Sequence, residues 1–561
     1  MTVATAHARM PLVFFGLAAI LLAAEARAEF CKCRDTSFAW AGCRDDAHCD
    51  QAGWTSCMAS PDDSYAVGAG CHVDVAPGDD VLLEQLAPAR FSVDDGGSVT
   101  VRGPVEWRVG PVGFLSAPGS HVELSGCFRR YGGTGPDCTD DLVADDLFTV
   151  GTVVPCRDGD CTGDAELMRI AYPDATPDLL AYLARLDVAR DVLCFWQDDE
   201  QGYVGADAGY CYKIAAVGPD PEDAYLDFDI RQVWRAQSDQ AGYPLARRLV
   251  QQGTLRGAHA IGAREIHLVE TNVVTSRTDQ MGRWVHCGTR HPFLIATVRD
   301  DPDGDVLVLA DGRGIDEDYA DGERCYIDWG WTAGDRAFVM APVHVTSSLN
   351  EGDTVFVRLG GAASLRAVVF DGLGGDGDHG RGAVQIIGGP LERFEHVWVA
   401  DPLVNDREPV YLDDLPCDAS VYHLTVTGGP AEPAFDKNYG LAWFGGPTCT
   451  YHLTHFYPRF QADDSFVLES RGLDPVAGMV IRYMHSGPSS APGDSGQLLD
   501  LGEPNPSTID AADLLCTACT TQDGLGQLVN TAMGGGTIAR LLWVGAFNGG
   551  TISAVPKPDA V

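Results

Sequence analysis

The stretch Phe394-Glu-His-Val-Trp-Val-Ala400 is one copy of a unit that recurs towards the end of the chain. Each unit has a short apolar strand, a turn rich in Gly, Asp and Pro, and a second short strand. Aligning the opening strands gives a period of roughly 27 to 34 residues, which indicates a solenoid. One unit cannot bury its apolar side alone, but stacked units share a continuous core. The aligned residues are Val368, Val397, Leu424, Leu453, Ile481, Leu515 and Leu542.

The remainder of the chain is also predicted to be rich in β-strands. Short runs that alternate apolar and polar residues lie between Gly and Pro from residue 72 onwards, as half-buried strands do. One helix is expected where Thr176 can cap the first turn and Pro177 suits that turn. Its apolar face is formed by Leu179, Leu180, Leu183 and Leu186. The predicted segments are a signal peptide (1–28), a Cys-rich segment (29–71), N-terminal coils or a cap (72–164), a β-rich intermediate domain (165–345) and a parallel β-helix (346–561).

The first residues predict export. An apolar run from Pro11 to Ala24 is followed by Ala26-Arg-Ala28, the pattern of a secretory signal peptide cleaved after Ala28. No other stretch is apolar enough to span a membrane. The net charge of −41 repels nucleic acid phosphates and anionic lipids, so neither is an expected partner. The sequence does not distinguish the periplasm, the cell surface and the medium.

The 18 cysteines agree with export, because disulfides persist outside the reducing cytosol. The pairing of Cys31, Cys33, Cys43, Cys49, Cys57 and Cys71 is left open, since six cysteines allow 15 pairings. Cys516 and Cys519 match a redox motif, but they fall in a repeat strand, and a local structural disulfide is favoured. The other predicted pairs are Cys127 with Cys138, Cys156 with Cys161, Cys194 with Cys211, Cys287 with Cys325, and Cys417 with Cys449.

A column of histidines is the main candidate for a binding site. Side chains alternate inwards and outwards along a strand, so if Val397, Leu424 and Leu453 face the core, the residue before each of them faces outwards. Such a face can stack on sugar rings and bind hydroxyl groups; the alternative is a polar ladder under a covering loop. The predicted ligand-binding residues are His396, Trp398, Asp401, His423, His452, Arg482 and His485.

The repeat region resembles the right-handed parallel β-helix of the pectate-lyase-like superfamily. The resemblance covers some 200 residues and rests on coil period and turn chemistry. It implies a glycan groove, and in some members catalytic groups, on the outward face of one strand column. The hydrolase pattern is incomplete, because Asp413-Asp414 occurs without Gly-His-Gly or Arg-x-Lys. A lyase would need a cation-bound acid near a base, for which the candidates are Asp401, Asp406, Arg407, Asp413 and Asp414.

Calcium is the one cofactor that the sequence suggests. Calcium prefers clustered oxygen ligands, and several Asp/Gly turns supply them. The leading candidate is the run Asp300-Asp301-Pro-Asp303-Gly-Asp305, although most such runs are plain turns.

The sequence therefore predicts an all-β protein: a right-handed parallel β-helix with a Cys-rich N-terminal segment and a β-rich intermediate domain. The leading function is recognition of a polysaccharide or cell-surface glycan, or an adhesive role, outside the cell. The alternative is a polysaccharide lyase or glycoside hydrolase that acts on the same outward face. Whether any reaction is catalysed is left open.

Overall fold

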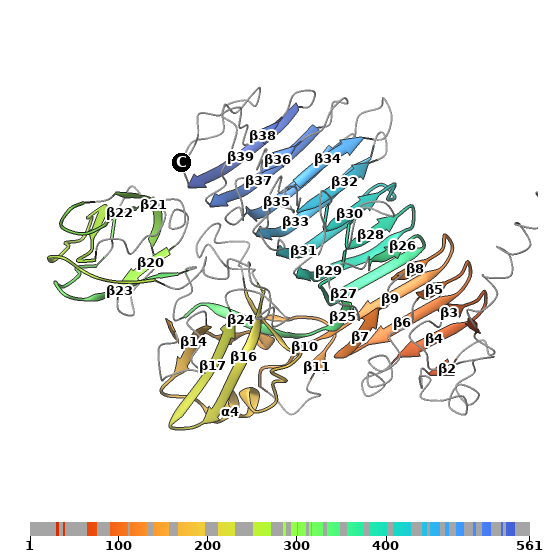
Figure 1. Cartoon of the computed structure of the whole chain (residues 1–561), viewed down its shortest axis with the longest axis horizontal. Helices are drawn as coiled ribbons and strands as arrows, with labels where there is room; N and C mark the ends of the chain where they lie inside the picture. Colours follow the sequence, from red (N-terminus) through yellow and green to blue (C-terminus); the bar gives the residue numbers. More distant parts are fainter. Residues whose placement is uncertain are drawn as a thin grey trace, which may run out of the picture.

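Two long parallel sheets form a β-solenoid in the computed structural model of the protein (Figure 1). Coils stack along the solenoid, and each contributes strands to both sheets. The structure describes residues 30–32, 38–39, 64–75, 90–109, 113–132, 138–155, 167–196, 211–229, 251–270, 284–287, 293–299, 301–309, 314–315, 317–328, 334–347, 356–374, 382–400, 408–427, 440–445, 449–459, 466–470, 478–486, 498–500, 508–517, 529–530 and 535–544.

The first solenoid sheet contains short parallel strands, one from each coil. In spatial order these are β1 (Phe30–Lys32), β3 (Ser64–Val67), β5 (Arg90–Val93), β8 (Phe114–Ser116), β26 (Val357–Leu359), β28 (Val384–Ile387), β30 (Val410–Asp413), β32 (Leu441–Gly445), β34 (Phe466–Ser470), β36 (Leu499–Asp500) and β38 (Val529–Asn530).

The second solenoid sheet contains the longer strands. In spatial order these are β2 (Phe38–Ala39), β4 (His72–Val75), β6 (Ser98–Arg102), β9 (His121–Ser125), β27 (Ala362–Asp371), β29 (Leu391–Ala400), β31 (Ser420–Thr427), β33 (Thr450–Arg459), β35 (Gly478–Ser486), β37 (Thr508–Thr517) and β39 (Gly535–Val544); β7 (Val105–Val109) and β25 (Val343–Ser347) extend it beside β27.

The solenoid core is a continuous stack of apolar side chains from both sheets. Val384, Val410 and Leu441 pair in register on successive coils and face inwards. Each fully buried side chain of this size contributes about 1.5–3 kcal/mol, so the stack stabilises every coil through its neighbours. The predicted all-β parallel solenoid is confirmed by the sheet pairing; its right-handed sense stays a prediction.

One coil of the solenoid is interrupted by a long insertion. The first half of β27 pairs with β9, where Arg366 lies opposite Ser125. The second half pairs with β25, where Val368 lies opposite Val343. Strands β9 and β25 are thus the two halves of a single coil, and the chain leaves the solenoid at Gly126 and returns at Pro342.

The insertion begins with an antiparallel sheet that packs on the second solenoid sheet. We call it the inserted sheet. Its strands, in spatial order, are β11 (Cys138–Thr139), β10 (Cys127–Arg129), β24 (Arg336–Ala341), β15 (Val192–Phe195), β16 (Cys211–Asp220), β17 (Asp223–Asp229), β14 (Leu167–Tyr172) and β13 (Thr152–Pro155), with β12 (Phe148–Thr149) beside β24; a short 3-10 helix spans Ala144–Asp146.

Alternation along these strands gives the inserted sheet two buried faces. Phe338 and Met340 of β24 pack with Val369 and Trp398 of the solenoid. Ala337 and Val339 of the same strand face the opposite side, together with the helix α4 (Pro177–Leu183). Helix α4 therefore lies on the side of the sheet away from the solenoid (Figure 1).

The predicted helix is confirmed, including its cap. The Leu179 backbone N–H donates to Thr176 Oγ1 over 3.2 Å, Pro177 occupies the first turn, and Leu179 and Leu183 are buried.

Replacing Thr176 by Ala should therefore cost about 1 kcal/mol of stability. A thermal unfolding midpoint checks this result, with Thr176→Ser as the matched control that keeps the cap. Equal midpoints for the two variants would contradict it.

The second part of the insertion, residues 251–328, is a six-stranded β-barrel. Its strands, in spatial order, are β18 (Gln251–Thr254), β23 (Arg324–Asp328), β20 (Trp284–Cys287), β21 (Phe293–Arg299), β22 (Val306–Leu309) and β19 (Glu265–His267). A bridge between Leu255 and Leu268 joins the chain next to the two edge strands. The sheet closes on itself there and surrounds an apolar core of its own.

Four of the predicted disulfides are present. Cys194–Cys211 and Cys287–Cys325 each join paired antiparallel strands, Cys127–Cys138 joins β10 to β11, and Cys417–Cys449 joins turns of adjacent coils.

The structure leaves the other predicted cysteine pairs untested. Cys156 and Cys161, which were predicted to pair with each other, both lie outside the described residues. Cys516 lies on β37, whereas its predicted partner Cys519 is outside the described residues. In the Cys-rich segment, Cys31 lies on β1 and Cys71 is a buried free thiol within the described chain. The remaining cysteines of that segment also lie outside the described residues: Cys33, Cys43, Cys49 and Cys57.

Two details of the sequence prediction are wrong. The alignment of Leu453, Ile481, Leu515 and Leu542 with Leu424 is out of register, because Leu424 pairs with Phe456 and Phe456 with Met484. The domain boundary at residues 164/165 falls within the inserted sheet, which already begins at β10. The signal peptide and most of the Cys-rich segment lie outside the described residues, and no helix within those residues has the length and apolar content to cross a membrane.

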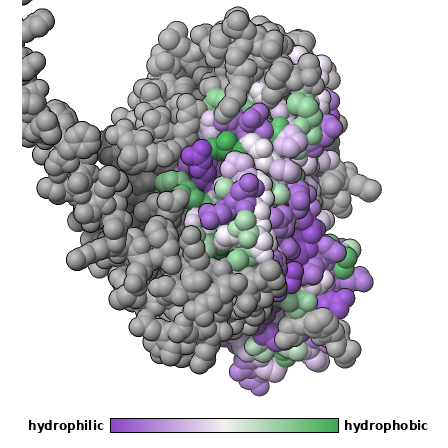
Figure 2. Space-filling model, turned by 90° about the vertical axis from the view of Figure 1, so that its right-hand side faces the viewer, coloured by the Kyte–Doolittle hydropathy of each residue, from purple (hydrophilic) through white to green (hydrophobic). Residues whose placement is uncertain are grey.

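The surface at the N-terminal end of the solenoid is mostly hydrophilic over its described part (Figure 2). Apolar residues are scattered across this view, and the described chain has only three large apolar side chains that are strongly exposed: Val143, Ile261 and Val269. This surface agrees with the strongly acidic composition.

Candidate functional site

The strands of the second solenoid sheet bend at the same place in successive coils. At each bend one residue adopts a left-handed backbone with φ between 51° and 61°. The residues on either side pair in register, so the bend residues form a column. His and Asp tolerate this conformation better than most residues other than glycine. We call this the bend column: Ala367, His396, His423, His455, Tyr483 and Asp513.

The bend explains why the predicted register fails. It places two residues, instead of one, between inward-facing positions, so that Leu453 and Phe456 on β33 both enter the core. The sequence alignment matched Leu453 to Leu424, whereas Leu424 is opposite Phe456. His455 is therefore the third histidine of the column, and His452 lies opposite Ser420 and Val480 instead.

The histidines of the bend column are buried under the inserted sheet. His396 is 6% exposed, and its ring lies 5.0 Å from that of Phe128, 5.5 Å from that of Phe338 and 4.5 Å from that of His423. Phe128 and Phe338 come from the inserted sheet. Burial, together with the nearby His455, Arg393 and Arg366, lowers the pKa of His396 from 6.5 to about 3. The ring is therefore neutral at physiological pH.

Trp398 is buried in the same interface. It is 0% exposed, and its Nε1–H donates to Thr427 Oγ1 over 2.9 Å. His423 and His485 are also buried. The prediction that these three side chains form an accessible face with His396 is wrong. The chain leaves the solenoid at Gly126, beside the bend column, and the inserted sheet packs over the nearest bend residues. It therefore covers His396, Trp398 and His423.

A second column on the same sheet stays half-exposed. Glu395 pairs with Tyr422, Tyr422 with Thr454, and Thr454 with Arg482, and each precedes a bend residue. Arg393 and His452 lie on the same side of the sheet, two residues earlier in their strands. We call this surface the open stripe: Arg393, Glu395, Tyr422, His452, Thr454 and Arg482.

An ion pair lies at each end of the open stripe. Arg393 Nε donates to Glu395 Oε2 over 2.6 Å, and Arg482 Nη2 donates to Asp510 Oδ2 over 2.9 Å. Between them, Tyr422 packs edge-on against the rings of His396 and His455, with centroids 5.4 Å and 5.2 Å away. The stripe thus presents donors, acceptors, one phenol ring and one imidazole ring on a sheet.

Two other carboxylates that the sequence suggested for catalysis, Asp413 and Asp414, do not lie on the stripe. Asp413 lies on β30 of the first solenoid sheet, where it is buried and accepts a hydrogen bond from Tyr411 Oη over 3.1 Å. Asp414 follows it and is exposed. Asp401, Asp406 and Arg407 lie outside the described residues.

The predicted calcium ligands lie on a turn of the barrel. Asp301 and Asp303 lie 3.8 Å and 3.9 Å from Arg256 Nη1, and Asp305 is buried. Asp300 lies outside the described residues. In the described part of the chain, no three His, Cys, Asp or Glu side chains are grouped as metal ligands. Calcium stays a prediction.

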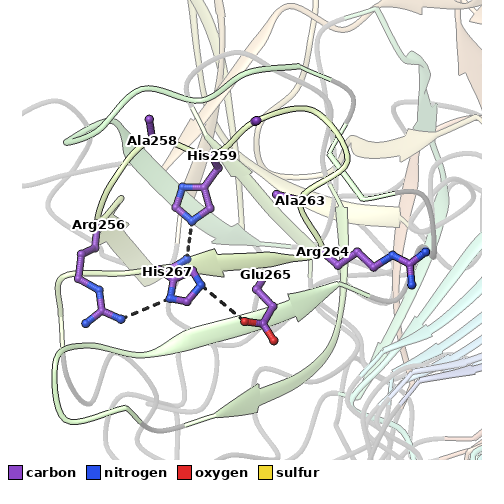
Figure 3. Close-up of a pocket in the computed structure, with 8 residues that line it drawn as sticks. Arg256, Ala258, His259, Ala263, Arg264, Glu265 and His267 are labelled. Atoms are coloured by element: carbon purple, nitrogen blue, oxygen red, sulfur yellow. Dashed lines mark hydrogen bonds and ion pairs between the residues drawn. The ribbon is translucent and has the colours of Figure 1, made fainter.

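A pocket of about 480 Å³ on the barrel was not anticipated from the sequence (Figure 3). Its polar lining comes from Arg256, His259, Glu265 and His267, and its small side chains include Ala258 and Ala263. The only sequence signal is two histidines eight residues apart around a Gly/Ala-rich loop, which is a weak one.

A comparison of the chain with protein-family models and with curated proteins finds no match.

Proposed function

We propose that this protein is a secreted or surface-exposed protein that recognises a polysaccharide along the open stripe. The observation that carries the proposal is the half-exposed column Glu395–Tyr422–Thr454–Arg482 on successive coils. The disulfides support a location outside the reducing cytosol. A β-solenoid is compatible with such a role.

The spacing of the open stripe suits an extended ligand made of repeating units. Neighbouring strands of a sheet are ~4.8 Å apart, so each coil offers one set of side chains at a fixed interval. Tyr422 supplies an apolar ring face with a polar tip. Arg393, Thr454 and Arg482 supply hydrogen-bond donors, and Glu395 supplies an acceptor.

Recognition fits the described residues of the stripe better than hydrolysis does. Glycoside hydrolysis requires two carboxyl groups about 5–9.5 Å apart on either side of one bond. Glu395 is the one carboxylate among the six residues of the stripe, and it is already bonded to Arg393. Asp141 of the insertion accepts from Nη2 of the same arginine over 3.3 Å, so both carboxylates are paired with one guanidinium. A binding surface needs no second acid.

The proposal predicts that substitutions in the stripe weaken glycan binding. Tyr422→Ala and Arg482→Gln should each reduce affinity for the bound polysaccharide by about tenfold, because each removes roughly 1–2 kcal/mol of contact. Retardation in gels that contain neutral or acidic polysaccharides measures the change. Release of reducing ends or unsaturated products, with and without calcium, would show catalysis.

Arg358→Gln is the matched control for charge. Arg358 is exposed on β26 of the other solenoid sheet, and its substitution changes the net charge as Arg482→Gln does. This variant should be retarded like the unmodified protein. If Tyr422→Ala and Arg482→Gln are retarded equally strongly, the open stripe is not the binding surface.

A further inference from the structure

The loop that forms one side of the barrel pocket is held rigidly. His259 Nδ1–H donates to the Gly257 carbonyl over 3.0 Å, and His259 Nε2 accepts from the His267 backbone N–H over 3.0 Å. The backbone of His259 also pairs with Tyr319. Because both ring nitrogens are satisfied, His259 is a structural residue that fixes the loop against β19.

Two carboxylates accept hydrogen bonds from the backbone of the same loop. Asp321 accepts from the Gly257 N–H over 2.6 Å, and Asp318 accepts from the Ile261 N–H over 2.9 Å. The Ile261 side chain is nevertheless 66% exposed, next to the lining residue Ala260. A pocket whose loop is held in this way is preformed and loses little entropy when a ligand binds.

The polar groups in the pocket form a chain in which Arg256 keeps unused donors. Glu265, at the other end, already accepts from Arg299 over 3.1 Å and 2.9 Å. A carboxylate offers about four acceptor sites, so Glu265 can still accept from a hydroxyl group. Arg256 Nη2 donates to His267 Nδ1 over 3.4 Å, and His267 Nε2 lies 3.6 Å from Glu265 Oε2 (Figure 3). Among the described residues this is the only hydrogen bond of the Arg256 side chain, whose two ion pairs are longer than hydrogen bonds. Arg264 also lines the pocket, but its guanidinium points away from His267 (Figure 3).

We propose that this pocket binds one pyranose unit of a neutral sugar. Each hydroxyl of a vicinal diol both donates and accepts, and the pocket offers the donor Arg256, the acceptor Glu265 and the imidazole of His267. The C–H face of the ring would rest on the small side chains of the loop, Ala258, Ala260 and Ala263. The volume of about 480 Å³ is within the range of small-molecule sites.

The charges around the pocket favour a neutral ligand over an anionic one. Asp301 and Asp303 lie 3.8 Å and 3.9 Å from Arg256 Nη1, and Asp318 and Asp321 bond the backbone of the loop. With Glu265, these carboxylates outnumber the guanidinium groups of Arg256, Arg264 and Arg299. A carboxylated sugar would meet this acidic surface on a chain of net charge −41. A neutral pyranose meets no such repulsion.

Saturation-transfer NMR on the full chain, with neutral methyl pyranosides and glucuronate at millimolar concentration, tests the proposal. At least one neutral pyranoside should receive saturation, and glucuronate should receive less. Arg256→Gln should weaken the binding of that pyranoside by about tenfold. Ala260→Trp should abolish it by filling the pocket without altering a charge.

Arg358→Gln is the control, and it should bind the pyranoside as the unmodified protein does. Arg256 and Ala260 lie on the barrel and not on the open stripe. Failure of the open stripe to bind polysaccharide would therefore leave this result unaffected, and the reverse holds as well. The proposal is overturned if no neutral pyranoside binds, if glucuronate binds more tightly, or if Arg256→Gln and Ala260→Trp both bind unchanged.

Discussion

Acidification from pH 7 towards pH 3 is expected to destabilise the packing of the inserted sheet on the solenoid. The pKa of His396 is lowered to about 3 in the folded protein, against 6.5 for an ordinary histidine. Between these values the unfolded chain binds more protons than the folded one, so stability is lost as the pH falls from about 6.5 to about 3. At about 1.4 kcal/mol per pKa unit, the free energy of unfolding should fall by about 5 kcal/mol over this whole range.

Thermal unfolding midpoints measured across this pH range, for the unmodified protein and for His396→Asn, check the prediction. Asparagine tolerates the left-handed bend and does not titrate. The midpoint of His396→Asn should therefore fall less steeply below pH 6.5. Parallel curves for the two proteins would show that His396 does not govern the acid sensitivity.

The second large effect is expected for Trp398→Ala. The indole is fully buried between the solenoid and the inserted sheet, and Nε1–H is bonded to Thr427. Truncation removes its packing on both sides and leaves a cavity, which should cost about 3–5 kcal/mol. Denaturant or thermal unfolding measures the loss.

Trp398→Phe distinguishes the contribution of Trp398 to stability from any contribution to glycan binding. It keeps most of the buried ring, so it should lose much less stability than Trp398→Ala, while it removes the indole N–H. Glycan retardation by Trp398→Phe should equal that of the unmodified protein, since a buried side chain cannot contact a polysaccharide. If Trp398→Phe keeps its stability but loses glycan binding, Trp398 is part of the binding surface.

Local patterns were enough to predict the fold class. The repeat period, the turn residues between apolar strands and the cap at Thr176 are properties of nearby residues, and the solenoid, the short helix and four disulfides agree with them. The register beyond β31 could not be predicted in the same way. A bend residue such as His455 adds one position between core residues, and strict two-residue alternation does not anticipate it.

The location of the binding surface depends on a contact between distant parts of the chain. His396 and Trp398 have the outward direction that alternation predicts, but Phe128 and Phe338 cover them from an insertion far away in the sequence. His452 and Arg482 remain accessible, because they lie on the half of the strand before the bend. Periodicity indicates the direction of a side chain, whereas its exposure depends on which segment packs above it.

The split coil accommodates the insertion without altering the repeat of the solenoid. Ser125 and Val343 face Arg366 and Val368, which are separated on β27 by Ala367 alone. Gly126 N–H also donates to the Arg366 carbonyl over 2.9 Å, as a neighbouring coil would. Everything between Gly126 and Pro342 thus occupies the place of a single residue in an uninterrupted coil. The insertion therefore leaves the register of the neighbouring coils unchanged, although it buries one face of them.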